Sequence, residues 1–407
     1  MRLLSNLLKR FIKRGSLTVL AADGRRYVFG NGETPQVTIR LHDPALERKL
    51  FSNPELHAAE AYMDDTLTIE EGGVYDFLYL FSINRTGLGG HPVQKLLRAG
   101  WRKLKRLQQY NPVGKAADNA KSHYDLSTDL YRLFLDDRLI YSCAFFEDPE
   151  HDTLEQAQAA KLRRIAAKLQ LKPGMSVCEI GCGWGAMAIY LAKVCGVKVT
   201  AINVSTDQLA EARRRGEAAG VGDLVDFREI DYRDLTGTFD RIVSIGMMEH
   251  VGVSHFDEYF GKVRDLLNPD GSALIHCIGR MTPPGTTSPF IRKYIFPGGY
   301  VPALSEVFAS TERCGLWVDD MEVLRLHYYH TIRHWRQRFA ANRDKAKALY
   351  DERFCRMWEF YLVAVELGFL NGSNMVFQLA LSTKRDALPI VRDYMVDEAR
   401  KLATHEQ

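Results

Sequence analysis

The sequence predicts an α/β protein in which a doubly wound, mostly parallel sheet follows a smaller N-terminal α+β region. From Leu171 onward, short strand patterns alternate with helical ones across short connections, which is typical of a parallel sheet with helices on both faces. Before residue 85 the pattern has period two between helical stretches. The 407 residues have room for both parts.

The N-terminal region, residues 1–85, begins with apolar and basic residues at helical spacing over 1–14. Residues 16–41 then alternate with period two, and the Asp23-Gly24 pair between two such runs indicates a hairpin. Helical patterns follow around 44–63 and 73–83. We therefore expect a small α+β domain here.

Glycines and a proline at 87–92 mark a boundary, and a basic helical pattern follows over 93–110. We expect a linker helix within residues 86–120, ahead of a catalytic domain at 121–407. Its basic faces fit two alternatives that the sequence leaves open: a helix lying on an anionic surface, or a solvated helix between domains.

The net charge of +3 is unevenly distributed. Residues 1–22 contain five basic residues and no acidic one, and residues 77–117 contain eight basic residues and no acidic one. The rest of the chain is therefore acidic, and the basic part predicts an anionic partner, either phospholipid headgroups or nucleic acid.

Compartment signals favour the cytoplasm. No apolar run is long enough to span a bilayer, and the first 14 residues lack the uninterrupted apolar core of a secretory signal. The seven cysteines are scattered without paired spacing, which favours a reducing compartment and predicts no metal site.

The C-terminal part contains five strand patterns in chain order, with helices expected from Trp184 and over 206–219 and 254–267. These strands read SVCEIG, VKVTAIN, VDFREI, FDRIVSIG and ALIHCIG, and two later strands around 317–324 and 375–383 are expected to complete the sheet.

A glycine-rich turn, Glu179-Ile-Gly181-Cys182-Gly183-Trp-Gly185, ends the first strand. Such glycines let a backbone approach a ligand closely, and the spacing also fits a dinucleotide site. A dinucleotide site needs an acid at the end of the second strand, where this chain has Asn203. With Glu179 before the loop, the residues favour S-adenosylmethionine over NAD, and a dehydrogenase remains the alternative.

Two strand ends carry chemically active side chains, Glu249 after FDRIVSIG and His276 within ALIHCIG. Parallel strands present their carboxyl ends at one edge of the sheet, so these groups are expected beside the glycine loop. The structural alternative makes Glu249 a cap for the helix near Ser254 and His276 a hydrogen-bonded core residue.

Eight blocks taken together resemble the cyclopropane-fatty-acyl-phospholipid synthase family, which includes the mycolic acid cyclopropane synthases. They lie in order from residue 123 to about residue 381 and read HYDLSTDLYRLFLD, YSCAFF, CEIGCGWGAMAIYLA, DRIVSIGMMEHVG, ALIHCIG, IRKYIFPGGYVP, HYYHTIRHWRQRF and FCRMWEFYL. The N-terminal region is similar to that of the phospholipid-acting members, and the resemblance implies a sterol-carrier-like fold there.

The resemblance implies a Rossmann-like class I methyltransferase fold and S-adenosylmethionine as methyl donor. Ten positions match residues that hold this cofactor, namely Tyr141, Ser142, Glu179, Gly181, Cys182, Gly183, Asn203, Val204, Gln208 and Tyr232. Gln208 would bind the ribose hydroxyls, which accounts for the missing acid, and Tyr232 would lie by the adenine.

The resemblance further implies methyl transfer to a cis double bond of a phospholipid acyl chain, with bicarbonate as the base that allows ring closure. Five positions match the bicarbonate ligands, namely Cys143, Glu249, His276, Ile278 and Tyr328. Many members have threonine where this chain has Cys277, beside two of these ligands.

The implied partners are unsaturated phospholipid, an anionic membrane surface at the inner face of the membrane and a second copy of the chain, without nucleic acid. Two rival functions remain: a methyltransferase that leaves a methylene or methyl branch, and a non-catalytic lipid- or RNA-binding protein with a methyltransferase-like fold.

Overall fold

The computed structural model describes residues 1–85 and 126–406. These residues form two compact units that do not follow chain order. The first combines residues 1–85 with Thr286–Phe296 and Ile332–Ser373, and the second contains the other described residues. The predicted domain boundaries at 1–85, 86–120 and 121–407 stay a prediction, and the predicted linker helix lies outside the described residues.

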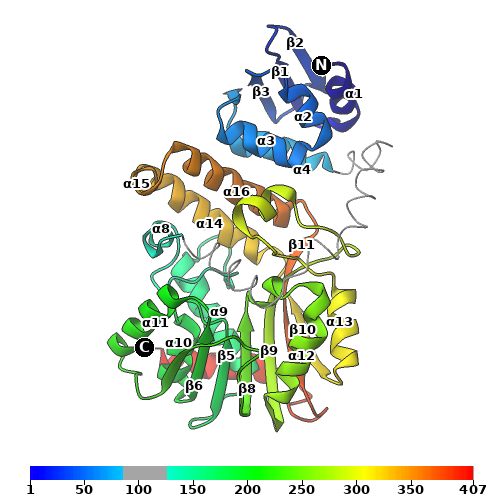
Figure 1. Ribbon diagram of the computed structural model, residues 1–407. Helices are drawn as coiled ribbons and strands as arrows, with labels where there is room; N and C mark the ends of the chain where they lie inside the picture. Colours follow the sequence, from blue (N-terminus) through cyan, green and yellow to red (C-terminus); the bar gives the residue numbers. More distant parts are fainter. Residues whose placement is uncertain (86–125, 407) are drawn as a thin grey trace. The chain divides into compact units, whose positions relative to one another are not determined.

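The N-terminal part of the first unit is α+β, as its pattern predicts. The sheet has the order β2-β1-β3-β4, with β1 and β2 forming the expected antiparallel hairpin around Asp23-Gly24 and β3 running parallel to β1. Its elements are α1 (Arg2–Phe11), β1 (Ser16–Leu20), β2 (Arg26–Gly30), β3 (Gln36–Leu41), α2 (Leu46–Ser52), α3 (Pro54–Met63), β4 (Leu67–Glu71) and α4 (Val74–Ile83). Figure 1 shows them in blue and cyan.

Helices from late in the chain complete the first unit. α16 (Glu352–Leu370), which follows α14 (His327–Ala341) and α15 (Arg343–Leu349), packs against α3 and α4. The rings of Tyr62 and Phe360 lie 6.0 Å apart, and Arg356 pairs with Asp65. Burial of these helices against the N-terminal residues explains why the unit gathers distant parts of the sequence.

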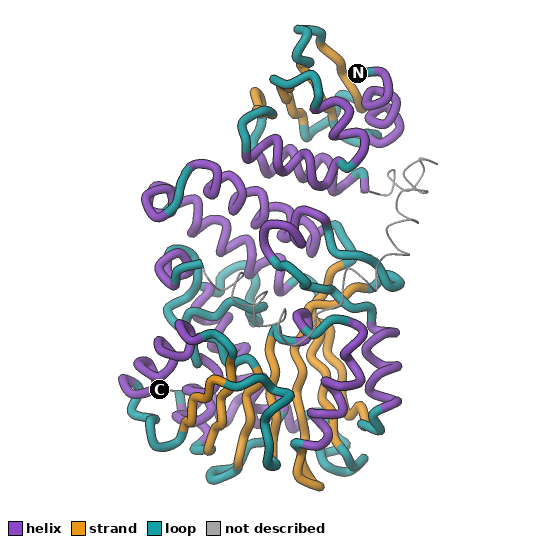
Figure 2. The backbone as a smooth tube through the Cα atoms, viewed as in Figure 1, coloured by secondary structure: helices purple, strands orange, loops and turns teal. Residues whose placement is uncertain are grey.

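The second unit is built on a seven-stranded sheet of order β10-β11-β9-β8-β5-β6-β7 (Figures 1 and 2). β5 to β9 pair in parallel, and β11 runs antiparallel to both β9 and β10. The strands are β5 (Ser176–Ile180), β6 (Lys198–Asn203), β7 (Val225–Glu229), β8 (Phe239–Ile245), β9 (Leu267–Arg280), β10 (Trp317–Val323) and β11 (Asn374–Ser382). The predicted doubly wound sheet is confirmed, with its order reversing between β5 and β8.

Two apolar layers cover this sheet, because alternate strand residues point to opposite faces. Val177 packs with α9, α10 and α11 on one face, whereas Cys178 packs with α12 and α13 on the other. The helices of the unit are α8 (Thr128–Arg132), α9 (Leu154–Lys168), α10 (Ala186–Cys195), α11 (Thr206–Ala218), α12 (Phe256–Asp265), α13 (Leu304–Arg313) and α17 (Tyr394–His405). No helix in the described ranges is long and apolar enough to cross a membrane.

Candidate active site

The glycine turn after β5 takes the shape that its residues require. Gly181, Gly183 and Gly185 all have positive φ, between 53° and 84°, a region that side chains with a Cβ disfavour. A Cβ on Gly185 would lie 3.0 Å from the side chains of Ala212 and Phe227, whereas one on Gly183 would meet no atom within 4 Å. The turn therefore packs on one side and leaves its backbone open on the other. The helix predicted from Trp184 begins at Ala186.

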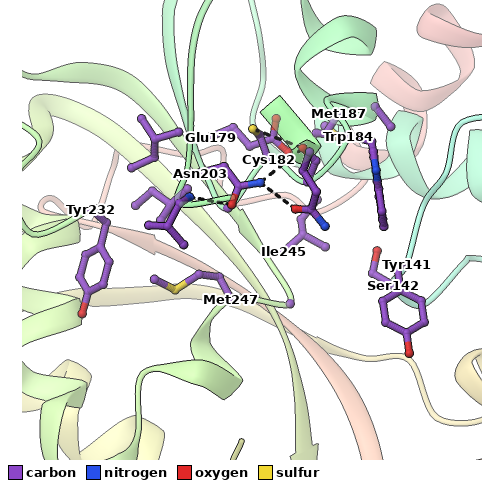
Figure 3. A pocket seen from close by; sticks show the side chains of 18 of the residues that line it. Tyr141, Ser142, Glu179, Cys182, Trp184, Met187, Asn203, Tyr232, Ile245 and Met247 are labelled. Carbon is purple, nitrogen blue, oxygen red and sulfur yellow. Dashed lines mark hydrogen bonds between the residues drawn. The ribbon is translucent and has the colours of Figure 1, made fainter. Parts of the chain in front are cut away.

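A cavity of about 190 Å³ opens beside this turn, at the carboxyl ends of β5, β6 and β8. All ten residues predicted to hold the cofactor line it, from Tyr141 and Ser142 to Tyr232. In Figure 3, Tyr232 and Met247 lie on one side of the cavity, and Tyr141, Ser142 and Trp184 on the other. Their convergence is a finding of the structure, since they come from five separate segments.

An amide pair stands at the end of β6, where a dinucleotide site would have its acid. The Asn203 side chain donates to Gln208 Oε1 over 2.8 Å, and its own oxygen accepts from the Val204 backbone over 2.8 Å (Figure 3, dashed lines). Gln208 is held at the start of α11, whose N-cap Ser205 accepts from its backbone. A neutral, preorganised pair therefore faces the cavity.

Glu179 lies in the cavity wall at the end of β5, 3% exposed. Burial raises the pKa of its carboxyl to about 8, against the lowering effects of the Ala188 backbone N–H and of Lys161. Its Oε2 has no hydrogen-bond partner among the described residues. A buried carboxyl oxygen without a partner in a cavity wall is suited to a donor group of a ligand, and a cationic group there would favour its ionised form.

Lys161 is a site residue that the sequence interpretation missed. Its side chain reaches the same cavity from α9, is 1% exposed, and donates to Ser142 Oγ over 3.0 Å. Burial lowers the pKa of its ammonium to about 8, although the carboxyls of Asp136 and Glu179 and the Cys143 thiol oppose that shift. The missed signal was positional: Lys161 and Lys168 both fall on the buried stripe of α9.

Glu249, Ile278 and His276 come together at the rim of the sheet next to the cavity. Glu249 Oε1 accepts from the Ile278 backbone N–H over 2.6 Å, and His276 lies two residues earlier on β9, on the same face of the strand. Glu249 caps no helix, since α12 begins after His255 and has no side-chain cap. The capping alternative is therefore wrong.

The electrostatics of this pair follow from burial. Burial raises the pKa of Glu249 to about 7, and it lowers that of His276 well below its usual range with help from the charges of Lys161 and Lys168. Glu249 Oε2 is buried and lacks a partner within the described ranges. The imidazole is therefore neutral, and the carboxyl gains or loses its proton near neutral pH.

Cys143 and Tyr328, the other two predicted ligands, come from two segments that meet at Thr331. The Thr331 hydroxyl accepts from the Ala144 backbone N–H over 3.0 Å, next to Cys143, and Tyr328 lies one helical turn before it on α14. Both side chains are buried. The charge of Lys161 acts on Cys143, Glu179 and His276, which shows that the thiol, the cavity wall and the imidazole share one electrostatic environment.

Aromatic rings surround the mouth of the glycine turn. The ring of Tyr131 lies 4.9 Å from that of Trp184 and 5.2 Å from that of Tyr141. Aromatic faces attract cations within about 6 Å. The site therefore combines a glycine cradle, polar amides, aromatic faces and a buried carboxyl–imidazole pair, which suits a cationic cofactor and a proton transfer.

Comparisons with known proteins identify two regions of the chain. The family model of mycolic acid cyclopropane synthetase matches residues 113–379, and that of a domain of unknown function (DUF7884) matches residues 3–81. In the part of the chain that the structure describes, no group of three histidine, cysteine or acidic side chains could hold a metal.

Among curated relatives, the cyclopropane-fatty-acyl-phospholipid synthase of Escherichia coli is 36% identical over 86% of this chain and 89% of its own length. The tuberculostearic acid methyltransferase UfaA1 of Mycobacterium tuberculosis is 34% identical over 93% of this chain and 90% of its own. Among solved structures, the mycolic acid cyclopropane synthase CmaA1 complexed with SAH and CTAB superposes with a TM-score of 0.62 at 31% identity, covering 67% of this chain and 99% of that one.

Proposed function

This chain belongs to the mycolic acid cyclopropane synthetase family, and from that premise we propose that it cyclopropanates unsaturated phospholipid acyl chains. It is a methyltransferase that uses S-adenosylmethionine, with the class I fold, so the dehydrogenase alternative falls. The phospholipid substrate is proposed from the relatives, and the observation that carries the ring closure is the buried Glu249–Ile278 and His276 group at the rim of the sheet, beside the cavity of the cofactor residues.

The cavity residues divide the proposed cofactor between them. Gly181 and Gly183 let the backbone approach its amino-acid part, and Glu179, with an orphaned oxygen, receives the ammonium. Gln208 takes the ribose hydroxyls beside Asn203, and Tyr232 lies by the adenine. Tyr141, Ser142, Cys182 and Val204 complete the wall.

Methyl transfer to an alkene makes particular demands on these residues. An alkene is a weak nucleophile, so the enzyme must hold it in line with the sulfonium methyl in a site that excludes water. The rings of Tyr141 and Trp184 line the cavity and supply aromatic faces that can stabilise a sulfonium or a carbocation, and the buried ring of Tyr131 packs against both. Because the site excludes water, a base from the solvent does not reach it. The group that accepts the proton of the transferred methyl must therefore be bound within the site.

The residues at the rim fit a small anion that carries its own proton. Cys143, Glu249, His276, Ile278 and Tyr328 are its proposed ligands, and Glu249 brings a buried oxygen that lacks a described partner. A bicarbonate held there would accept the proton that the new methyl group must lose before the ring closes. Because burial raises the pKa of Glu249 to about 7, its carboxyl can donate to an anion instead of repelling it.

The sibling reaction, which ends in a methylene or methyl branch, is not favoured. It needs the same cofactor and the same positioned alkene. The two reactions differ only in how the carbocation that methyl transfer leaves on the acyl chain is neutralised. The five residues of the proposed anion site are those that the motif resemblance assigns to ring formation. Against a non-catalytic protein, the rim holds a buried carboxyl and a buried imidazole with shifted pKa values, and such groups cluster at functional sites.

We further propose that the enzyme works on an anionic membrane surface at the inner face of the membrane. The five basic residues of 1–14 are exposed on or just after α1, while the apolar face of that helix, including Leu4 and Phe11, is buried. Each such residue near an anionic surface contributes about 1 kcal/mol. The sterol-carrier likeness of residues 1–85 and the homodimer stay predictions.

Incubation of the purified protein with methyl-labelled S-adenosylmethionine and vesicles of a cis-unsaturated phospholipid tests the proposal. We expect label in the acyl chains and ring protons at high field in the proton NMR spectrum of the product. Vinylidene signals would establish the sibling reaction, and label in RNA, or in nothing, would overturn the function.

A further inference from the structure

A buried chain of side chains runs behind His276, away from the groups assigned above. Gln378 lies opposite His276 in the β9–β11 register, and its amide nitrogen is 3.2 Å from His276 Nδ1. On the other side, Gln378 Oε1 is 2.6 Å from Lys168 Nζ. All three side chains are 2% exposed or less.

The donors and acceptors of these three side chains allow only one arrangement of the hydrogen bonds between them. An ammonium has hydrogens and no lone pair, so Lys168 can only donate, and the amide oxygen of Gln378 must face it. The amide NH₂ of Gln378 then faces the imidazole, and because NH₂ can only donate, Nδ1 of His276 must offer a lone pair. A neutral imidazole with a bare Nδ1 carries its proton on Nε2.

Burial lowers the pKa of the Lys168 ammonium, and Glu322, at the other end of this row of side chains, opposes that effect and favours the charged form. Its ammonium also pairs with Glu322 Oε2 over 2.6 Å, and Arg164 donates to the same carboxylate over 2.9 Å. Glu322 thus stays ionised. Burial is the largest single effect and raises its pKa, but Arg164 and Lys168 together outweigh burial and lower the pKa to about 2. The orientation of the Gln378 amide is therefore set by Lys168, which lies 210 residues earlier in the sequence.

We propose that Lys168 and Gln378 are positioning residues that lock His276 in the Nε2–H tautomer, so that its imidazole acts as a hydrogen-bond donor and not as the base. The consequence of this tautomer for catalysis rests on the proposed function: an Nε2–H group would donate to the bound bicarbonate, whereas the lone pair of an unprotonated Nε2 would repel it. The tautomer itself follows from the hydrogen bonds alone.

The test uses the full chain labelled with ¹⁵N in histidine, with no cofactor or lipid added. The His276 signals are identified by their loss in His276→Asn. We expect Nδ1 to show the shift of an unprotonated ring nitrogen and Nε2 that of a protonated one. A protonated Nδ1 in the unaltered protein would overturn the proposal.

Gln378→Glu reverses the bond, because a carboxylate can only accept, and it should move the proton to Nδ1. Lys168→Met should leave the Gln378 amide free to turn and give a mixture of tautomers. Ser382→Ala, at a buried position on the same face of β11, is the matched control and should leave the His276 signals unchanged. An unchanged tautomer in folded Gln378→Glu contradicts the lock.

The functional consequence is measured separately. In Gln378→Glu, the bicarbonate concentration that half-restores turnover in CO₂-depleted buffer should rise roughly tenfold, the usual worth of a hydrogen bond to a charged group. If the tautomer reverses and bicarbonate dependence is absent in every variant, the proposed function fails while the tautomer assignment stands. If bicarbonate dependence is normal and the tautomer is Nδ1–H, the lock fails and the function stands.

Discussion

Replacing Glu249 with glutamine separates the effect of this carboxyl on the free energy of unfolding from its role in turnover. Glu249 is 8% exposed, and burial raises its pKa from 4.5 to about 7. Between these two values the folded protein keeps a proton that the unfolded chain releases, so stability is full below about pH 4.5 and falls as pH rises through about 7. A shift of this size corresponds to about 3 kcal/mol, at about 1.4 kcal/mol per pKa unit.

Glutamine cannot ionise, and its amide oxygen can still accept from the Ile278 backbone. Glu249→Gln should therefore be more stable than the unaltered protein by about 3 kcal/mol at about pH 8, and by less than about 1 kcal/mol at about pH 5. Urea denaturation at both pH values measures the difference, and Glu217→Gln, at an exposed position of α11, controls for the substitution. A stability difference that is the same at both pH values would refute the reasoning.

The same variant should bind S-adenosylmethionine normally and lose most of its turnover, because the glycine turn is untouched while the anion site is altered. Isothermal titration and the vesicle assay measure the two properties. Unchanged turnover in Glu249→Gln would remove this carboxyl from the mechanism.

Three further predictions follow from single features of the structure. Lys161→Met should weaken cofactor binding roughly tenfold by titration, because it removes a buried cation from the cavity wall; equal affinity would make Lys161 a packing residue. Gly185→Ala should lower the free energy of unfolding by about 1–3 kcal/mol, since its Cβ would press on two side chains, whereas Gly183→Ala should mainly impair cofactor binding; the reverse order would contradict the geometry of the turn. Glutamates in place of Arg2 and Lys9 should reduce sedimentation with anionic vesicles, most strongly at low salt, and salt-independent loss would point to misfolding.

Local patterns and motif matches predicted much of this molecule. Gly24, with a φ of 81°, supplies the conformation that the Asp23-Gly24 hairpin turn requires, and the glycines after β5 specify their turn for the same reason. The ten cofactor positions came from matched motifs. Eight of them line one cavity because they lie at or just after the carboxyl ends of parallel strands, and Tyr141 and Ser142 reach it from the segment before α9.

The features that the sequence concealed depend on long-range pairing. Gln378 meets His276 only because β11 inserts beside β9, 102 residues later in the chain. Lys161 and Lys168 look like ordinary helix residues until the face of α9 that carries them is known to be buried. The association of α16 with α3 and α4 likewise has no local signal, since it joins residues far apart in the sequence, such as Tyr62 and Phe360.

Ring formation in CO₂-depleted buffer tests the central mechanistic claim most directly. With S-adenosylmethionine and unsaturated vesicles saturating, the rate should fall when CO₂ is removed and recover when bicarbonate is added, while cofactor affinity stays constant. Equal rates of ring formation with and without bicarbonate would mean that no trapped anion takes the proton.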